Sequence, residues 1–397
     1  MKRRSLKLTA LLCLCAGVNS LMAQTDPPQT DPINVVTTAV PFLRISPDAR
    51  AGGMGDLGVA TSPDANSPFW NLAKTPFATS NFSVGLTYTP WLKDLGLNDV
   101  YLLAAAGYYK LDEEQALAAS VRYFSLGNIT FTDPSGNDFG EGRPREFGVD
   151  FGYTRKLSDR IGLGIALRYI NSNLAAGAPN AGNAYKPGNA VAGDISFFYT
   201  GANAEGQGWN FGATLTNLGT KIGYTNDATQ KDYIPANLSF GTAYTRVFDE
   251  SNKIQIGLDV HKLLVPTPPN FAGMTDDEAA EAAREYRQKS VVSSWFSSFG
   301  DAPGGFSEEL KEFQFSVGLE YSYNDQFMAR AGYFYEDKTK GNRKYFTVGL
   351  GIKYNVFGLN FSYLVPSGSG VNRNPLSNTL RFGLVFDLDQ VASGGDN

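Results

Sequence analysis

The sequence predicts an all-β protein, a transmembrane antiparallel β-barrel of about fourteen strands that lies in an outer membrane. Three observations predict this class. Segments of alternating apolar and polar residues recur along the chain, and the connections between them alternate between short and long. No apolar run after the N-terminal region reaches the roughly 20 residues that a membrane-spanning helix needs. A barrel fits all three, because only every second side chain of its strands faces lipid.

Residues 1–23 have the pattern of a secretory signal peptide. A basic start is followed by the apolar run Leu8–Val18 and by the small residue Ala23 at the predicted cleavage site. A transmembrane anchor is the alternative, but the apolar run is too short to span a bilayer. A lipoprotein signal is another alternative, but Cys13 and Cys15 each follow a leucine where a small residue is expected.

The predicted mature chain contains no cysteine, because both cysteines lie in the signal peptide. It therefore has no disulfide framework, no thiolate zinc site and no catalytic cysteine. Four of the 34 basic residues also leave with the signal, and the remaining 30 against 39 acidic residues give a net charge of −9. This balance argues against a nucleic-acid partner. No cluster of metal ligands is evident, and we expect neither a metal nor another cofactor.

The predicted strands have one apolar and one polar face. In Phe313–Tyr323 the apolar face carries aromatic and aliphatic residues, and the opposite face carries Gln314, Ser316, Gly318, Glu320 and Ser322. Fourteen such segments are predicted near residues 82–90, 98–110, 115–125, 145–156, 161–171, 190–200, 208–217, 237–248, 253–262, 313–323, 327–336, 344–354, 357–365 and 378–388.

The lengths of the connections predict how the barrel is oriented. Short connections such as Asn324–Gln326 and Asn355–Val356 alternate with long ones such as Ser172–Asn189 and Lys262–Glu312. Outer-membrane barrels have short periplasmic turns and longer extracellular loops. An even strand number then places both termini in the periplasm. We expect the barrel over residues 79–390 and a periplasmic tail over 391–397. A soluble β-sandwich is the alternative, but it gives no reason for regular alternation of loop lengths.

Charged residues on the polar faces indicate the lumen side of the strands. A charge that faces lipid in the middle of the bilayer costs about 2–4 kcal/mol. We therefore expect the lumen to contain Arg122, Asp150, Arg168, Asp194, Asp259, Glu320, Arg330 and Arg381. Since both signs are present, ion pairs across the lumen are expected.

The segment before the first strand is rich in glycine and other small residues. Its glycine spacing superficially resembles a nucleotide-binding loop, but no βαβ unit surrounds it. Small residues allow a compact segment to approach the barrel backbone closely. We therefore interpret residues 24–78 as an N-terminal extension and hatch that plugs the barrel. The candidate hatch residues are Asp48, Arg50, Gly52, Gly53, Gly55, Asp56, Trp70 and Asn71.

These residues also carry a family resemblance. Ala51-Gly52-Gly53-Met54-Gly55, followed by Val59-Ala60, Asp64-Ala65 and Trp70-Asn71-Leu72-Ala73, resembles the hatch of the fourteen-stranded FadL superfamily. The longer run Thr38–Thr61 is similar to the PorV (LptO) family of the Bacteroidota type IX secretion system. Similarity to that family extends over most of the chain, from about residue 34 to residue 386.

The resemblance implies a non-enzymatic outer-membrane component of a protein-export machine. Members of the family associate with a giant translocon barrel (SprA or Sov) and accept cargo proteins through their C-terminal signal domain. They deliver this cargo to a cell-surface attachment complex that contains the sortase PorU. An outer-membrane protein of this kind is also in contact with lipid and lipopolysaccharide.

The long connection Lys262–Glu312 has two features of its own. Thr275-Asp276-Asp277-Glu278 is a capping-box pattern, and the alanine-rich residues after it predict an extracellular helix of about three or four turns. The apolar stretch that follows needs a cover or a partner. It either packs on neighbouring loops or binds a partner through Val291, Val292, Trp295, Phe296 and Phe299.

Two further functions remain as alternatives. A FadL-like transporter of small hydrophobic molecules would need an apolar pocket near the extracellular end and a lateral opening in the barrel wall, with an open path past the hatch. A surface hydrolase would need a nucleophile, a base and an orienting group within mutual reach. His261 is the only histidine and lies in phase with Asp259 on a predicted strand. A lone histidine beside an acid is more often structural, so we predict no catalytic residue.

Overall fold

Fourteen antiparallel strands close on themselves into one barrel, as the sequence predicts. The computed structural model describes residues 33–132, 135–177, 185–227, 229–271, 273–365 and 376–388. The predicted signal peptide and the predicted C-terminal tail lie outside these residues. The barrel closes between its first and last strands, where pairing runs from Ser83–Asp387 to Tyr88–Phe382.

The barrel strands follow one another around the wall, and each pairs with its neighbours along the chain. They are β1 (Phe82–Pro90), β2 (Val100–Lys110), β3 (Gln115–Leu126), β6 (Arg145–Ser158), β7 (Ile161–Asn173), β8 (Gly188–Thr200), β9 (Gly208–Gly219), β12 (Asn237–Val247), β13 (Asn252–Leu263), β14 (Gln314–Tyr323), β15 (Phe327–Tyr335), β16 (Lys344–Tyr354), β17 (Phe357–Leu364) and β18 (Leu380–Asp387). Two small hairpins, β4 (Ile129–Thr132) with β5 (Asp138–Gly142) and β10 (Ile222–Gly223) with β11 (Lys231–Asp232), extend from two of the long connections.

Burial alternates along the strands because their two faces meet different surroundings. In β14, Phe315 and Val317 are exposed on the outer wall, whereas Ser316 and Glu320 are buried. All eight charged residues expected in the lumen are buried, which agrees with the prediction from the cost of charge in lipid. The described residues contain no helix that is both long and apolar enough to cross a membrane.

The short and long connections lie at opposite ends of the barrel, which we call the short-turn end and the long-loop end. The turn between β14 and β15 illustrates the first kind. Asn324 and Asp325 have φ values of 52° and 53°, and the Gln326 N–H donates to the carbonyl of Tyr323 at 3.0 Å. Two consecutive left-handed residues form the tight hairpin turn that matches the twist of the strands.

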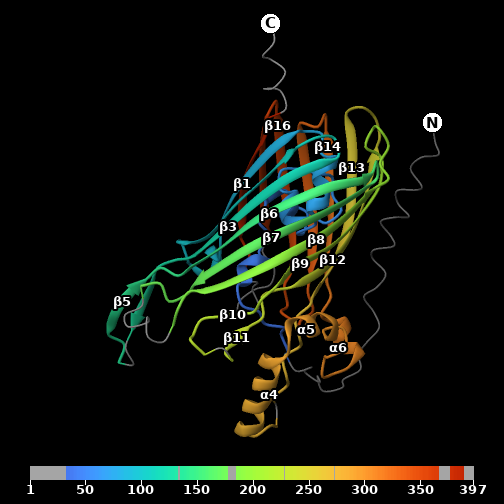
Figure 1. The fold of residues 1–397 in the computed structure, drawn as a ribbon. Helices are drawn as coiled ribbons and strands as arrows, with labels where there is room; N and C mark the ends of the chain where they lie inside the picture. Colours follow the sequence, from blue (N-terminus) through green and yellow to red (C-terminus); the bar gives the residue numbers. More distant parts are fainter. Residues whose placement is uncertain are drawn as a thin grey trace, which may run out of the picture. The chain divides into compact units, whose positions relative to one another are not determined.

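The long-loop end carries the helices of the β13–β14 connection and the β4–β5 hairpin (Figure 1). These helices are α4 (Asp276–Gln288), α5 (Val291–Ser297) and α6 (Phe306–Leu310). The capping box at Thr275 is present, and it begins the helix that the sequence predicts. A short 3-10 helix, η3 (Lys93–Leu95), lies in the β1–β2 connection.

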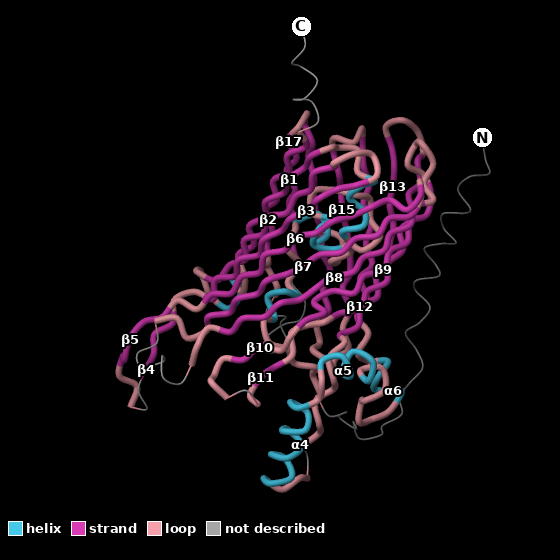
Figure 2. Tube along the Cα trace, in the orientation of Figure 1, coloured by secondary structure: helices cyan, strands magenta, loops and turns pink. Residues whose placement is uncertain are grey.

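The barrel lumen is filled by the residues before β1. This lumenal segment, Asn34–Ala78, contains η1 (Pro41–Arg44), α2 (Ala49–Gly52), α3 (Ser67–Trp70) and η2 (Leu72–Phe77), and its short helices lie inside the ring of strands (Figure 2). Part of it packs with the wall in an apolar cluster, whose buried members are Val40, Phe42, Leu43, Val100, Leu102, Phe124, Ile170, Ala190, Ala192, Ile222 and Ile234.

The lumenal segment crosses the barrel from the long-loop end to the short-turn end. The Asn34 N–H donates to the carbonyl of Thr339 in the β15–β16 connection at 3.0 Å. At the other end, the carbonyl of Ala78 accepts from Lys110 Nζ at 3.4 Å. The even number of strands therefore places the start of β1 and the end of β18 together at the short-turn end. It does not determine at which end the lumenal segment begins.

Candidate functional site: the lumenal segment and the β13–β14 loop

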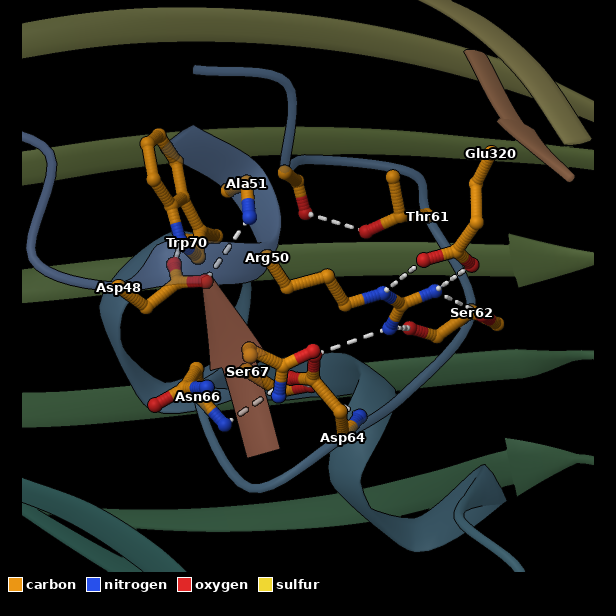
Figure 3. A network of polar contacts seen from close by, with 12 residues as sticks. Asp48, Arg50, Ala51, Thr61, Ser62, Asp64, Asn66, Ser67, Trp70 and Glu320 are labelled. Carbon is orange, nitrogen blue, oxygen red and sulfur yellow. Dashed lines mark hydrogen bonds and ion pairs between the residues drawn. The ribbon is translucent and has the colours of Figure 1, made fainter. Parts of the chain in front are cut away.

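Arg50 is the centre of a polar network that connects the lumenal segment to the wall (Figure 3). Its guanidinium donates to both carboxylate oxygens of Glu320 on β14, at 3.0 and 2.8 Å. Its remaining donors bind the Asp64 carboxylate at 2.9 Å and Ser62. The Glu320 carboxylate also accepts from Arg330 on β15 at 2.6 Å. A planar guanidinium suits this bidentate arrangement, which fixes both position and orientation.

Asp48 organises the short helix that carries Arg50. Its Oδ1 accepts from the Ala51 N–H at 2.8 Å, which is the N-cap bond of α2. Its Oδ2 accepts from the indole N–H of Trp70 at 2.5 Å, so the carboxylate joins α2 to α3. Asn71, the next residue, donates to the carbonyls of Val59 at 2.9 Å and of Phe197 on β8 at 2.9 Å. The predicted polar residues of the hatch thus meet in one region of the lumen.

The hatch glycines lie where the backbone of the lumenal segment touches the barrel wall. Gly55 has a φ of 70°, and its N–H donates to Thr347 Oγ1 at 2.8 Å. A Cβ at this position would lie 2.6 Å from the backbone nitrogen of Tyr333. Gly53 approaches the backbone of Gly349 on β16, whereas Gly52 lies against the side chain of Arg381. Any side chain at Gly55 would be strained by its φ and would also collide with β15.

Asp56 follows these glycines and makes a weaker set of contacts. Its Oδ2 accepts from the hydroxyl of Tyr345 at 2.6 Å. Its Oδ1 lies 3.8 Å from Arg381 Nη2 and has no hydrogen-bond partner within the described part of the chain.

Two residues hold the lumenal segment in ways that the sequence did not predict. Lys74 is 1% exposed, and its Nζ donates to the Gly58 carbonyl at 2.7 Å and to Thr61 Oγ1 at 3.1 Å. Asp259 on β13 accepts from the N–H groups of Gly58 at 2.7 Å and Val59 at 2.8 Å. For Asp259, the only indication in the sequence is an acidic residue on the inward face of a strand in a protein with a glycine-rich segment. For Lys74, the sequence gives no such indication.

His261 lies two residues after Asp259 on the same strand, but the two side chains have different partners. His261 Nδ1 is 2.8 Å from Ser239 Oγ, whereas Asp259 binds the lumenal segment. Among the described residues there is also no group of three or more histidine, cysteine, aspartate or glutamate side chains with metal-site geometry.

The apolar residues predicted in the β13–β14 loop divide between two faces of α5. Val291 and Trp295 pack inward against a group of loop residues that includes Ile234, Leu264 and Val265. Val292 and Phe296 point outward and are 57% and 75% exposed, and Phe299 beyond the helix end is also exposed. From the sequence we expected the five residues to form one patch, because a helix of seven residues is too short to show its period clearly.

The outward residues continue onto α6. Phe306 and Leu310 are exposed there as well. Lys262 joins the two parts, because its Nζ lies 5.6 Å from the centre of the Phe299 ring and 2.7 Å from a carboxylate oxygen of Glu309 on α6. We call Val292, Phe296, Phe299, Phe306 and Leu310 the exposed loop face.

The C-terminal end of α4 is anchored while the rest of this helix contains no buried residue. Lys221 Nζ donates to the carbonyls of Arg287 and Lys289 at 2.6 Å each, and it lies 4.1 Å from the centre of the Tyr233 ring. A cation at a helix C-terminus is favourable because unpaired carbonyls lie there. The Tyr233 hydroxyl also donates to the Lys289 carbonyl at 2.8 Å, and burial raises the pKa of this tyrosine to about 12.

Comparison with known proteins gives a family match and a set of similar folds. The family model described as type IX secretion system protein PorV matches residues 28–270. No curated protein sequence matches the chain significantly.

Several solved structures of channels and transporters are similar to the chain. The deltaS2 mutant of the TodX monoaromatic hydrocarbon channel is 12% identical with a TM-score of 0.49, covering 86% of this chain and 97% of its own. The toluene transporter TbuX of Ralstonia pickettii is 12% identical with a TM-score of 0.47, covering 85% and 96%. A FadL homologue of Pseudomonas aeruginosa is 11% identical with a TM-score of 0.45, covering 89% and 99%.

Proposed function

We propose that the chain recognises cargo for the type IX secretion system of the outer membrane, because it belongs to the PorV family of type IX secretion system proteins. In this proposal it binds the giant translocon barrel and the C-terminal signal domain of cargo proteins. It then carries the cargo to the surface attachment complex that contains a PorU-like sortase. The family match is the observation that carries the proposal, and the mechanism is recognition without catalysis.

The orientation that the proposal requires follows from the loop lengths. Long loops of outer-membrane barrels are extracellular and short turns are periplasmic. The helices α4, α5 and α6 would then face the outside, where partners of an export machine are met. The start of β1 and the end of β18 would face the periplasm. The lipid-facing wall would contact outer-membrane lipid and lipopolysaccharide.

The exposed loop face is the candidate contact surface for these partners. Large apolar side chains that remain exposed on a folded surface commonly mark interaction sites, and aromatic residues supply much of the binding energy at interfaces. Phe296 and Phe299 are the candidate anchors, together with Val292. Val291 and Trp295 have a different proposed role, because they pack inward and hold α5 on the barrel.

Transport of small hydrophobic molecules through the lumen is the alternative. The contacts of the lumenal segment speak against it. Arg50 binds β14, Asn71 binds β8 and Asp259 of β13 binds the segment in turn. A ligand path would require several buried polar bonds to break together, and each of these groups would lose its partner in a buried environment.

Affinity purification of the tagged protein from native outer membrane tests the proposal. The wild type should retain a giant barrel, cargo with C-terminal signal domains and a sortase. The double variant Phe296→Ser/Phe299→Ser should retain them at least tenfold less. Tyr185→Ser removes an exposed aromatic side chain from the β7–β8 loop and serves as the control. Equal recovery of all partners by the double variant would remove the exposed loop face from the proposal, and recovery of none by the wild type would contradict the proposed function itself.

A further inference from the structure

A cavity of about 130 Å³, lined by both polar and apolar side chains, lies between the lumenal segment and the wall. The lumenal segment contributes Ile45, Ser46, Pro47 and Trp70 to its lining. The wall contributes residues near the long-loop end, including Leu263 at the end of β13. The cavity therefore has room for a small polyatomic anion or for several water molecules.

Guanidinium groups dominate the charge that faces this cavity. Arg44, Arg122, Arg168 and Arg343 line it, whereas Asp56 is the only carboxylate among its described lining residues. Arginine stays protonated in proteins, so these four groups carry positive charge whatever their surroundings. The cavity is therefore a place where a negative charge is favoured.

Three of the four arginines have carboxylate partners. Arg168 donates to Asp150 and, at 2.9 Å, to Asp194. Arg343 and Arg44 share a single carboxylate, that of Glu336, at 2.8 and 3.3 Å. One carboxylate thus serves two guanidinium groups on the same side of the cavity.

Arg122 has no carboxylate within 4.0 Å among the described residues. Its Nη1 donates to the carbonyl of Leu43 at 2.7 Å and its Nη2 to that of Phe69 at 3.5 Å. The guanidinium also lies 4.9 Å from the centre of the Phe69 ring. The side chain is 5% exposed, and its Nε is buried without a hydrogen-bond partner in the part of the chain that the structure describes. A buried cation that contacts only carbonyls and a ring lacks most of the compensation that burial of charge requires.

We propose that the cavity binds one small oxyanion, a carboxylate or phosphate group, between Arg122, Arg44 and Arg343. Planar guanidinium groups match the oxygen geometry of such anions, and Arg122 gains the charged partner that the protein does not supply. The volume admits an anion of the size of acetate or phosphate and excludes a long hydrocarbon chain. The bound anion joins the lumenal segment, through Arg44, to β3 and to the β15–β16 connection.

Isothermal titration of the full chain in detergent, with inorganic phosphate and with acetate as separate probes, tests this site. We expect saturable binding of at least one probe and no comparable binding of chloride, which lacks the paired oxygens. Arg122→Gln should weaken binding at least tenfold. Arg44→Gln should weaken it as well, and it carries the test if Arg122→Gln fails to fold, because Arg44 is partly exposed.

Arg155→Gln is the matched control, since Arg155 is an exposed arginine paired with Glu114. It should bind the probes as the wild type does. Absence of saturable binding to the wild type, or unchanged affinity in both Arg122→Gln and Arg44→Gln, would overturn the proposal and leave the cavity filled with water alone.

Discussion

Arg50 illustrates how single side chains hold the lumenal segment in place. It binds Glu320 of the wall and Asp64 of its own segment, so one guanidinium compensates two carboxylates. Its replacement leaves Asp64 without this partner and leaves Glu320 to Arg330 alone. Breaking a buried pair by removing one partner costs about 3–5 kcal/mol, because the remaining charge stays buried.

We therefore expect Arg50→Ala to loosen the lumenal segment. Hydrogen exchange of residues 48–71 should accelerate, and the ion conductance of the protein in planar bilayers should increase. The control is Arg284→Ala, which breaks an exposed pair with Glu281 and should change neither quantity. Wild-type exchange in Arg50→Ala would show that the network around Arg50 does not hold the segment.

Gly55 allows backbone strain to be separated from steric contact. Gly55 and Gly96 both have positive φ, 70° and 80°, but only Gly55 lies against another strand. An L-residue at either position costs about 1–2 kcal/mol in backbone strain. Gly55→Ala should lower the free energy of unfolding distinctly more than Gly96→Ala, as measured by denaturant titration. Equal losses of unfolding free energy in the two variants would mean that the β15 backbone at Tyr333 moves to accommodate the added Cβ without an energetic cost.

The sequence predicts which charged side chains face the lumen, but it does not predict which groups they bind there. The alternation of residues placed Glu320, Arg330 and Asp259 in the lumen, since lipid excludes charge. Which acid meets Arg50 depends on how the lumenal segment is folded inside the closed barrel, and no local pattern contains that information. Lys74 was missed for the same reason, because its partners are carbonyl and hydroxyl groups of the segment itself.

At the scale of elements, the strands were predictable and the short helices were not. Each barrel strand presents one face to lipid and one to the lumen, so the two-residue period is strong over its whole length. The helix α4 was predictable because its capping box and alanine-rich sequence are local signals. In contrast, α5 and α6 have seven and five residues, which is too few for a helical period to stand out.

The capping box gives a prediction for α4. Thr275→Ala removes the hydroxyl that accepts from the Glu278 N–H, so the first turn should fray. A spin label at Ala280→Cys should become more mobile by electron paramagnetic resonance. The predicted mature chain lacks cysteine, so the label has a single site. Unchanged mobility would mean that α4 is held by its C-terminal anchors alone.

The same spin label gives a pH dependence. The hydrogen bonds from the Thr275 N–H and hydroxyl hold the pKa of Glu278 below its usual value of 4.5. A lowered pKa means that the carboxylate stabilises the helix above pH 4.5 and that this contribution is lost as the pH falls through the lowered value. Mobility of the label should therefore increase on strong acidification. The variant Glu278→Ala should have this mobility already at neutral pH.

At the scale of the whole molecule, the lumenal segment fills the barrel, and the helices of the β13–β14 loop lie at one end of it. The exposed loop face lies at the long-loop end, whereas Asn355 lies in a short turn between β16 and β17. An impermeant maleimide should label Phe296→Cys on intact cells and should label Asn355→Cys only after lysis. Labelling in the reverse pattern would contradict the orientation that we propose.

We propose that the protein recognises export partners through the exposed loop face. The most direct measurement is the amount of a cargo protein with a C-terminal signal domain that reaches the cell surface. In cells whose only copy carries Val292→Ser, Phe296→Ser and Phe299→Ser, we predict loss of most surface cargo, although the barrel is present in the outer membrane at its normal level. Cells with Tyr185→Ser should display cargo normally. Wild-type display by the triple variant would contradict the claim.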